Sequence, residues 1–283
     1  MIATEATESG TLDDVLHSIG VDYLTATAVE PDDYQPLHSL ATALFRVQAE
    51  KGNNPKAWGM AGFKGWSCGS VAIGRREKET LVRLSSDSAA LSWRGVVHLA
   101  TNISRIDLQA TVLPHDGPSA RIDRHRNQAH DNSAESGNRK VVRWVRDNRG
   151  GYTLYLGQRT SICFGRIYDK SVESKLSCYE GCIRYEVQYH NKLAKRVACA
   201  LASDHQTIPR IASYCRQFFS GRGVDLELQY NDRSTYCSPR TRSDADRNLA
   251  WLSQAVRPTV LRLIACGRGA EALSALGLVQ EEP

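Results

Sequence analysis

Charged and phenolic side chains recur at alternate positions along three segments whose apolar pattern predicts β-strands. The first segment offers Asp107, the second Arg166 and Tyr168, and the third Arg184 and Glu186. Alternate residues of a strand share one face, so these groups would converge if the three strands were neighbours in one sheet. Carboxylates gathered at one spot suit a hard divalent cation such as Mg²⁺ or Mn²⁺. A tyrosine beside a cation is a candidate nucleophile, because the positive charge favours the phenolate.

The same alternation has an ordinary structural interpretation. A sheet with one face in water also carries Arg and Glu at alternate positions, where they pair across strands and do no chemistry. Periodicity by itself favours this second interpretation.

The elements that must position these residues follow from apolar periodicity. Strands are expected over 21–29, 66–75, 79–84, 103–113, 152–156, 164–169 and 182–190. Helices are expected over 34–49, 87–99, 191–202, 208–219, 245–266 and 271–276. Residues 115–136 are rich in Pro, Asn, Asp, Arg and Ser, which predicts a long loop. Strands in one block and helices mostly at the end predict an α+β fold, with a largely antiparallel central sheet flanked by helices and a helical C-terminal tail. No internal repeat is visible.

Composition narrows the class of protein. The chain has 283 residues, of which 41% are hydrophobic, so it can bury a core. Lys and Arg (36) slightly outnumber Asp and Glu (31), and the net charge of +5 permits an anionic partner without requiring one. No apolar run approaches the roughly 18 residues of a membrane span. The acidic start lacks the basic region of a secretory signal, and the eight cysteines are scattered, as expected for thiols in a reducing bacterial cytoplasm.

An ordered set of motifs resembles the replication initiation factor family, the Rep-trans type initiators of rolling-circle plasmids and some phages. The set comprises GYTLYLGQRTS from Gly151 to Ser161, Arg166-Ile-Tyr168-Asp-Lys170-x-x-Glu173, Arg184-Tyr-Glu186, Arg105-Ile-Asp107 and the opening strand Val21-Asp-Tyr-Leu-Thr. With the landmark Leu84-Ser-Ser and an ending from Trp251 to Leu278, the resemblance covers roughly residues 21–278.

The resemblance implies a site-specific enzyme that nicks and closes DNA at a replication origin. Tyr168 would attack a phosphodiester, become joined to the 5′ end and leave a 3′ hydroxyl. A divalent metal, Mg²⁺ or Mn²⁺, would polarise the phosphate. Transesterification conserves the bond energy, and the sequence has no Walker-type phosphate loop. The implied roles are Asp107 and Glu186 as metal ligands, Glu173 as a third ligand or a proton acceptor, and Arg166, Lys170 and Arg184 as groups that bind phosphate or stabilise the transition state.

Two departures from related patterns bear on the metal. Many relatives have a second aspartate where this chain has Thr111, which puts the number of ligands in doubt. The His-hydrophobic-His metal motif of better-known nickases is missing. His125 and His130 lie in the expected loop, where solvated histidines are the ordinary case.

DNA binding needs a basic surface, and two segments are candidates. The larger set is Arg121, Arg124, Arg126, Arg139, Lys140, Arg143 and Arg146, with Trp144 placed to stack on an unpaired base. The smaller set is Lys192, Lys195 and Arg196. The alternative for the larger set is a charged surface loop followed by a helix, with Val141, Val142 and Trp144 facing the core.

The expected organisation is a flexible segment over 1–20, a catalytic nicking domain over 21–240 and the helical tail over 241–283. One alternative is a conjugative relaxase of the related transposon type. Those relatives usually carry a helix-turn-helix domain ahead of the catalytic part, and about 20 residues leave no room for it. Another is a non-catalytic DNA-binding replication regulator, which the Thr111 change favours and the retained tyrosine and acids oppose. A homodimer and a host DNA helicase partner are implied by the resemblance.

Overall fold

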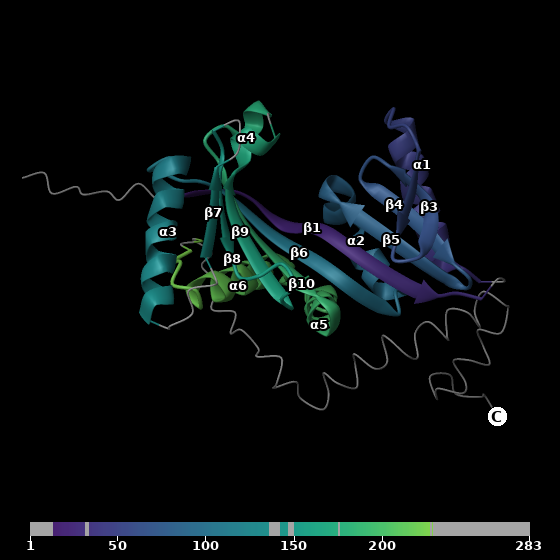
Figure 1. Ribbon diagram of the computed structural model, residues 1–283. Coiled ribbons are helices and arrows are strands. Elements are labelled where there is room, and N and C mark those ends of the chain that lie inside the picture. The colour runs from purple at the N-terminus through teal and green to yellow at the C-terminus, as the bar shows by residue number, and fades with distance from the viewer. Residues whose placement is uncertain are drawn as a thin grey trace, which may run out of the picture.

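The computed structural model describes residues 14–31, 34–135, 142–146, 150–174, 176–226 and 228. In this part the chain forms one ten-stranded antiparallel sheet with helices packed against it (Figure 1), which confirms the α+β expectation. The strands are β1 Val15–Val29, β2 Lys56–Met60, β3 Phe63–Cys68, β4 Val71–Arg76, β5 Glu79–Ser85, β6 Asn102–Leu113, β7 Val142–Arg146, β8 Tyr152–Leu156, β9 Cys163–Asp169 and β10 Ile183–His190. The helices are α1 Pro36–Glu50, α2 Ser86–Leu99, α3 Pro118–Glu135, α4 Lys170–Ser174, α5 Asn191–Ala202 and α6 Thr207–Ser220, with a 3-10 turn at Ser177–Tyr179.

The sheet is built from two similar halves. Its strand order is β2-β3-β4-β5-β1-β6-β10-β9-β8-β7, so the order runs outward identically from β1 and from β6. Each half contains a long strand, a helix, four more strands and a helix in that order, and the second half adds α4, the 3-10 turn and α6. The strand-to-helix junctions also match, because α2 begins at Ser86 and α5 at Asn191, both with a left-handed φ (48° and 54°). The two halves share their topology but not their residues at equivalent positions. Five residues before these junctions, for example, the first half has Leu81 and the second has Glu186.

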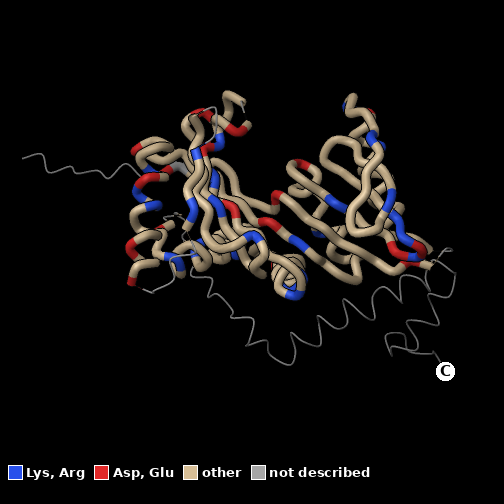
Figure 2. The backbone as a smooth tube through the Cα atoms, viewed as in Figure 1, with Lys and Arg blue, Asp and Glu red and all other residues tan. Residues whose placement is uncertain are grey.

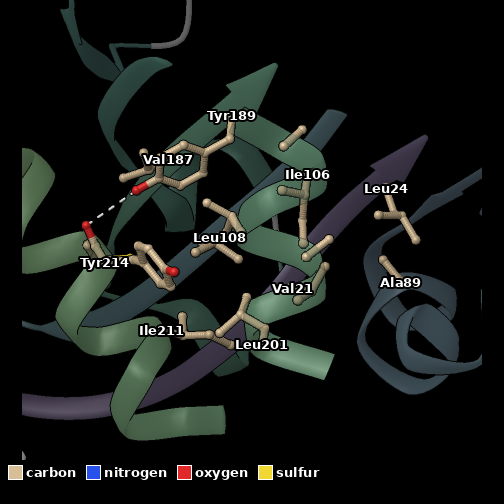
Figure 3. Close-up of a cluster of buried hydrophobic side chains, with 14 of the residues drawn as sticks. Val21, Leu24, Ala89, Ile106, Leu108, Val187, Tyr189, Leu201, Ile211 and Tyr214 are labelled. Carbon is tan, nitrogen blue, oxygen red and sulfur yellow. Dashed lines mark hydrogen bonds between the residues drawn. The ribbon is translucent and has the colours of Figure 1, made fainter. Parts of the chain in front are cut away.

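The apolar face of the sheet carries the core. Leu108 and Val187 pack against Leu201 of α5 and Ile211 of α6, and in the other half Leu24 lies beside Ala89 of α2 (Figure 3). This close packing depends on a glycine in β9. A Cβ added at Gly165 would lie 2.2 Å from the Phe218 ring of α6, so a larger residue would push this helix from the sheet. Helices therefore cover one face of the β6-β10-β9 region and leave the polar stripes on the other.

The expected loop over 115–136 is wrong, because most of it is the 18-residue helix α3. Its buried face is largely polar, with Arg121, His125 and Ser133 beside Ile122 and Ala129, which hides the periodicity from an apolar criterion. His125 is therefore not solvated. Its Nε2 lies 2.8 Å from the Tyr185 hydroxyl across the core. His130, by contrast, is exposed on this helix.

Other boundaries need smaller corrections. The single strand expected over 66–75 is two strands, β3 and β4, joined by a turn in which Gly69 has a φ of 52°. Strand β2 was not expected, and β7 replaces the helical alternative for Val142 and Trp144. Strand β1 begins at Val15, so residues 15–20 are not a flexible segment. The helices expected over 245–266 and 271–276 lie outside the described residues.

The structure also bears on the cysteines and on membrane-spanning helices. The cysteines in the described part are free thiols, and Cys68, Cys182 and Cys215 are buried among them. No helix in that part is long and apolar enough to cross a bilayer.

Candidate active site

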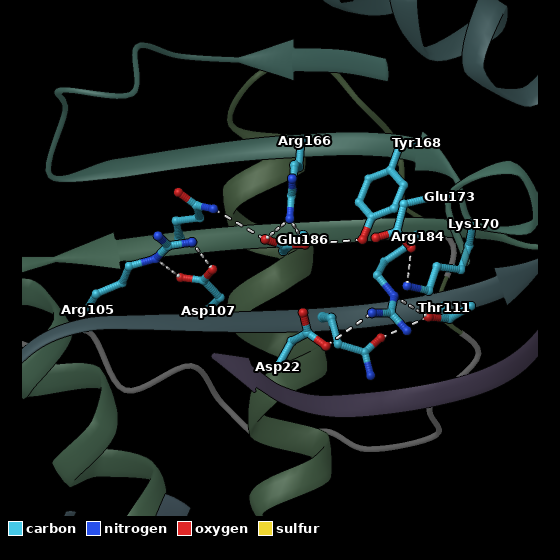
Figure 4. Close-up of polar contacts among 12 residues, drawn as sticks. Asp22, Arg105, Asp107, Thr111, Arg166, Tyr168, Lys170, Glu173, Arg184 and Glu186 are labelled. Atoms are coloured by element: carbon cyan, nitrogen blue, oxygen red, sulfur yellow. Dashed lines mark hydrogen bonds and ion pairs between the residues drawn. The ribbon is translucent and has the colours of Figure 1, made fainter. Parts of the chain in front are cut away.

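The three strands with polar stripes are neighbours, in the order β6-β10-β9. Register places Glu186 opposite Arg166 and Arg184 opposite both Tyr168 and Thr111. Their side chains share one face with Asp107 (Figure 4), opposite the face that α5 and α6 cover. The predicted convergence of acids, guanidinium groups and a tyrosine is therefore present.

These side chains do not form a solvated face, although Arg166 and Glu186 do pair across strands. Asp107 is 1% exposed, Glu186 0% and Arg184 5%, although all three are ionisable. Tyr168 is also buried. Ionisable groups are rarely buried this deeply unless they are paired, because removing a charge from water costs on the order of several kcal/mol. The partners of each group therefore define the site.

Glu186 is the centre of the network. Arg166 Nη2 donates to its two carboxylate oxygens at 2.8 and 2.7 Å, and the Tyr168 hydroxyl lies 3.3 Å from Oε2. Gln188 Nε2 lies 3.3 Å from Oε1. Burial alone would raise the pKa of Glu186, but the charge and hydrogen bonds of Arg166 hold it below its ordinary value. The carboxylate is thus ionised and in contact with the phenol.

The phenol itself is held in its protonated form. Burial is the largest cause that raises the pKa of Tyr168, and the charge of Glu186 raises it further. Arg184 and Arg166 act in the opposite direction. Arg166 lies over the ring, with its Cζ 5.0 Å from the ring centre. Deprotonation of Tyr168 therefore requires more positive charge than the free protein supplies, or an acceptor.

Asp107 is paired with a residue that the sequence analysis gave no role. Arg105 Nε and Nη2 donate to its two oxygens at 2.8 and 2.5 Å. Burial nevertheless raises the pKa of Asp107 from 3.8 to about 7, and Glu186 adds to the rise while Arg105 and Arg166 oppose it. The positive charges of Arg105 and Arg166 therefore compensate the negative charge of Asp107 only in part.

This raised pKa predicts a pH dependence of stability in the metal-free protein. The folded state keeps the proton of Asp107 at pH values where the unfolded chain has released it, so the free energy of unfolding falls as the pH rises from about 4 to about 7. Urea denaturation at pH 5 and pH 7.5 measures the fall. Asp107→Asn should flatten it, and an equal fall in both proteins would contradict the assignment.

Asp22 is a site residue that the sequence analysis missed. It lies in β1, at the register shift between Val21 and Tyr23, and its Oδ1 is 3.1 Å from Arg184 Nη1. Arg184 Nε also donates to Thr111 Oγ1 at 2.9 Å, so Asp22 and Thr111 share one guanidinium (Figure 4). Burial raises the pKa of Asp22, and Arg184 acts against it. The signal was present, since an acid interrupts the apolar opening strand, but the bulge hides the face on which it lies.

Helix α4 brings the last two predicted residues to the site. Asp169 Oδ1 accepts hydrogen bonds from the backbone N–H groups of Ser171 and Val172, and so fixes the start of this short helix. Lys170 Nζ then lies 2.5 Å from Glu173 Oε2. Glu173 is half exposed and lines a pocket together with Tyr168.

A metal shell is not ready-made from the predicted ligands. Within the described residues, the set of three ligand atoms lying within 4.8 Å of one another belongs to Asp14, His115 and Asp116. Arg121 pairs with both of these aspartates, so their charge is already compensated. The three predicted ligands lie in one region, but each pairs with a different cation. Asp107 pairs with Arg105, Glu186 with Arg166 and Glu173 with Lys170.

The pairing of Arg121 corrects its predicted role in DNA binding. Its side chain is 3% exposed and forms an ion pair with Asp14, which is 4% exposed. Burial would lower the pKa of this guanidinium, but the hydrogen bonds to Asp14 and Asp116 raise it instead. Arg121 therefore attaches α3 to the start of β1 and offers no surface charge.

Replacing Arg121 tests this structural role. Arg121→Met should lower the free energy of unfolding by about 3–5 kcal/mol, because it removes the buried guanidinium that pairs with both Asp14 and Asp116. Arg124→Met is the matched control. Arg124 pairs with the same Asp116 but is about half exposed, and we expect a cost below about 1 kcal/mol. Urea denaturation measures both. Unchanged stability with weakened DNA binding for Arg121→Met would restore the original prediction.

The other predicted DNA-binding residues are dispersed. Arg126 lies over the Trp144 ring, and Trp144 stacks on Tyr152, on the sheet face opposite Tyr168. Arg146 lies over Tyr152 on that same face. Arg124 is exposed on α3. Lys192, Lys195 and Arg196 lie on α5, which covers the sheet face opposite Tyr168, and Lys195 donates a hydrogen bond to the Thr101 carbonyl. Arg143 shares the face of the site, opposite Tyr155, while Arg139 and Lys140 lie outside the described residues. Charge along the backbone is mixed in sign (Figure 2).

Fold and site together define an α+β protein whose sheet buries a tyrosine among acids and arginines. The chain belongs to the replication initiation factor family, whose model matches residues 101–274, more than half of its length. A solved structure of a rolling circle replication initiator protein from Geobacillus stearothermophilus is similar in fold. It is 18% identical with a TM-score of 0.51, and the match covers 84% of this chain and 97% of that one. No curated protein sequence matches the chain.

Proposed function

We propose that this protein initiates rolling-circle replication as a site-specific DNA nicking and closing enzyme. The observation that supports this best is the Tyr168 hydroxyl, which contacts the buried carboxylate of Glu186 with Arg166 over its ring. A phenol oxygen held between an acceptor and cations is suited to attack a phosphate. Family membership and the fold of the Geobacillus initiator support the same substrate class.

The proposed reaction is a transesterification. The Tyr168 oxygen attacks the phosphorus, and the bond between the phosphorus and the 3′ oxygen breaks. The phenol loses its proton, and the 3′ oxygen gains a proton. The protein is then joined to the 5′ end, and reversal of the same steps closes the strand. Arg166 and Arg184 would stabilise the charge on the phosphate, and Lys170 would bind a neighbouring phosphate. Glu173, in the pocket beside Tyr168, is the proposed proton acceptor.

The acids of the site are of the type that binds a divalent metal, although their oxygens pair with arginines in the free protein. Asp107 and Glu186 are buried oxygen donors, Asp22 adds a third from β1, and Mg²⁺ and Mn²⁺ prefer such oxygens. The raised pKa of Asp107 indicates that its negative charge lacks compensation, which a cation would provide. When bound, the metal would polarise the scissile phosphate. In this proposal Asp22 would supply the carboxylate that many relatives have at the position of Thr111. Glu173 would then not be needed as a metal ligand.

The test is formation of a protein–DNA adduct that survives detergent. The full chain is incubated with Mn²⁺ and single strands from its own replicon, and the products are separated on a denaturing gel. An adduct at one position, with a free 3′ hydroxyl, is expected. Origin binding without any adduct would instead favour a non-catalytic regulator, and an adduct at a transfer origin would favour a relaxase. The homodimer and the host helicase partner stay predictions, and sedimentation of the full chain tests the first.

A further inference from the structure

A pocket opens beside Tyr168 on the polar face of the sheet. It lies between β8, the end of β9 and the start of α4, and its walls include Thr153, Tyr155, Arg166 and Glu173. Register explains the arrangement, because Tyr155 lies opposite Arg166 and Thr153 opposite Tyr168. The pocket thus shares one wall with the proposed nucleophile.

The second aromatic wall of this pocket has the features of a stacking site. Tyr155 is half-buried and stacks on Phe164, with ring centres 5.8 Å apart and planes 22° apart. Arg159, which is exposed, holds its Cζ 5.5 Å from the Tyr155 ring centre. The guanidinium of Arg159 lies over the Tyr155 ring, where a planar base could stack instead. Because Arg159 is exposed, its side chain can move to contact a phosphate. Arg143 lies opposite Tyr155 in β7 and adds positive charge at the same edge.

We propose that this pocket binds the unpaired base of the nucleotide next to the phosphate that Tyr168 attacks. Tyr155 stacks on the base, and Arg159 and Arg166 bind the phosphates on either side of it. A base held in a duplex cannot expose its face to Tyr155, so the pocket selects single-stranded DNA. The inference rests on the proposed function, since it takes the position of the phosphate from Tyr168.

Fluorescence anisotropy with two labelled probes tests the proposal. One probe is a strand of thymidylate about 20 nucleotides long, and the other is an abasic strand of the same length. All proteins carry Tyr168→Phe, which keeps the ring and prevents cleavage. Tyr155→Leu should weaken binding of the thymidylate strand about 10- to 100-fold, the loss expected for one stacked base. It should leave the affinity for the abasic strand unchanged.

Two further variants guard against a folding effect. Tyr155→Phe retains a stacking ring and should bind like the parent. Trp66→Leu removes an aromatic ring that is 58% exposed in the other half of the sheet, and should also bind like the parent. The proposal is overturned if Tyr155→Leu binds thymidylate as tightly as the parent, or if it weakens both probes equally.

The adduct assay separates this proposal from the proposed function. If wild-type protein forms an adduct but binding is independent of Tyr155, the pocket proposal alone fails. If no adduct forms while the loss in Tyr155→Leu is specific to bases, the pocket stands as a single-strand binding site and the nucleophile assignment fails.

Discussion

Tyr168→Phe should abolish the covalent protein–DNA adduct, with a drop of at least about 1,000-fold in the rate of its formation. The substitution removes one oxygen and leaves the ring beneath Arg166. The hydrogen bond from that oxygen to Glu186 is long, at 3.3 Å, so its removal should change folding little. Denaturing gels with end-labelled single strands measure the adduct, and thermal unfolding checks the fold.

A second buried tyrosine provides the control. Tyr189 lies in β10, the strand next to Tyr168, but its ring faces the core and its hydroxyl lies 3.5 Å from the Tyr214 carbonyl. Tyr189→Phe therefore makes the same chemical change on the opposite face of the sheet. It should form adduct at the wild-type rate. Equal adduct formation by wild type and Tyr168→Phe would rule out Tyr168 as the nucleophile.

Glu186→Gln should lower the rate of adduct formation by about 100- to 10,000-fold, the range for a charged group that assists proton transfer or transition-state stabilisation. The amide keeps the shape of the carboxylate but removes the charge that faces Arg166, Arg184 and Tyr168. We also expect weaker Mn²⁺ binding, measured by the paramagnetic resonance signal of free Mn²⁺. Stability should fall by about 2 kcal/mol, because charged hydrogen bonds become neutral.

Glu79→Gln is the matched control for this substitution. Glu79 accepts hydrogen bonds from Arg76 in the other half of the sheet, at 2.9 and 2.5 Å, and its side chain is 36% exposed. Adduct formation and Mn²⁺ binding should both be unaffected. If Glu186→Gln lost stability but retained adduct formation and Mn²⁺ binding, Glu186 would be a structural partner of Arg166 and no more.

The strands that form the site were predictable because their periodicity is simple. In β10 the residues alternate between apolar and polar, so Glu186 and Arg184 fall on one face whatever the partner strand. The helix α3 was not predictable in this way. Its buried positions hold Arg121 and His125, whose burial depends on Asp14 and Tyr185 far away in the sequence.

The ion pairs within the site could not be predicted from the sequence either. Alternation places Arg105 and Asp107 on one face but does not say that they bond to each other and not to neighbours on β10. Asp22 was missed because a register shift in β1 changes which residues face the site. The positions of side chains on a regular strand can thus be read from periodicity, whereas bulges and ion-pair partners depend on the folded chain.

The long strand β1 has a consequence for fragments of this protein. It belongs to the first half of the chain, yet it pairs with β6 along its length and supplies Asp22 to a site built from the second half. A fragment cut where the family match begins, at residue 101, would leave the hydrogen-bonding edge of β6 open to other chains. It would also separate Arg184 from one of its carboxylate partners. Proposed catalytic residues that cluster in the second half of the chain therefore do not make that half an autonomous module.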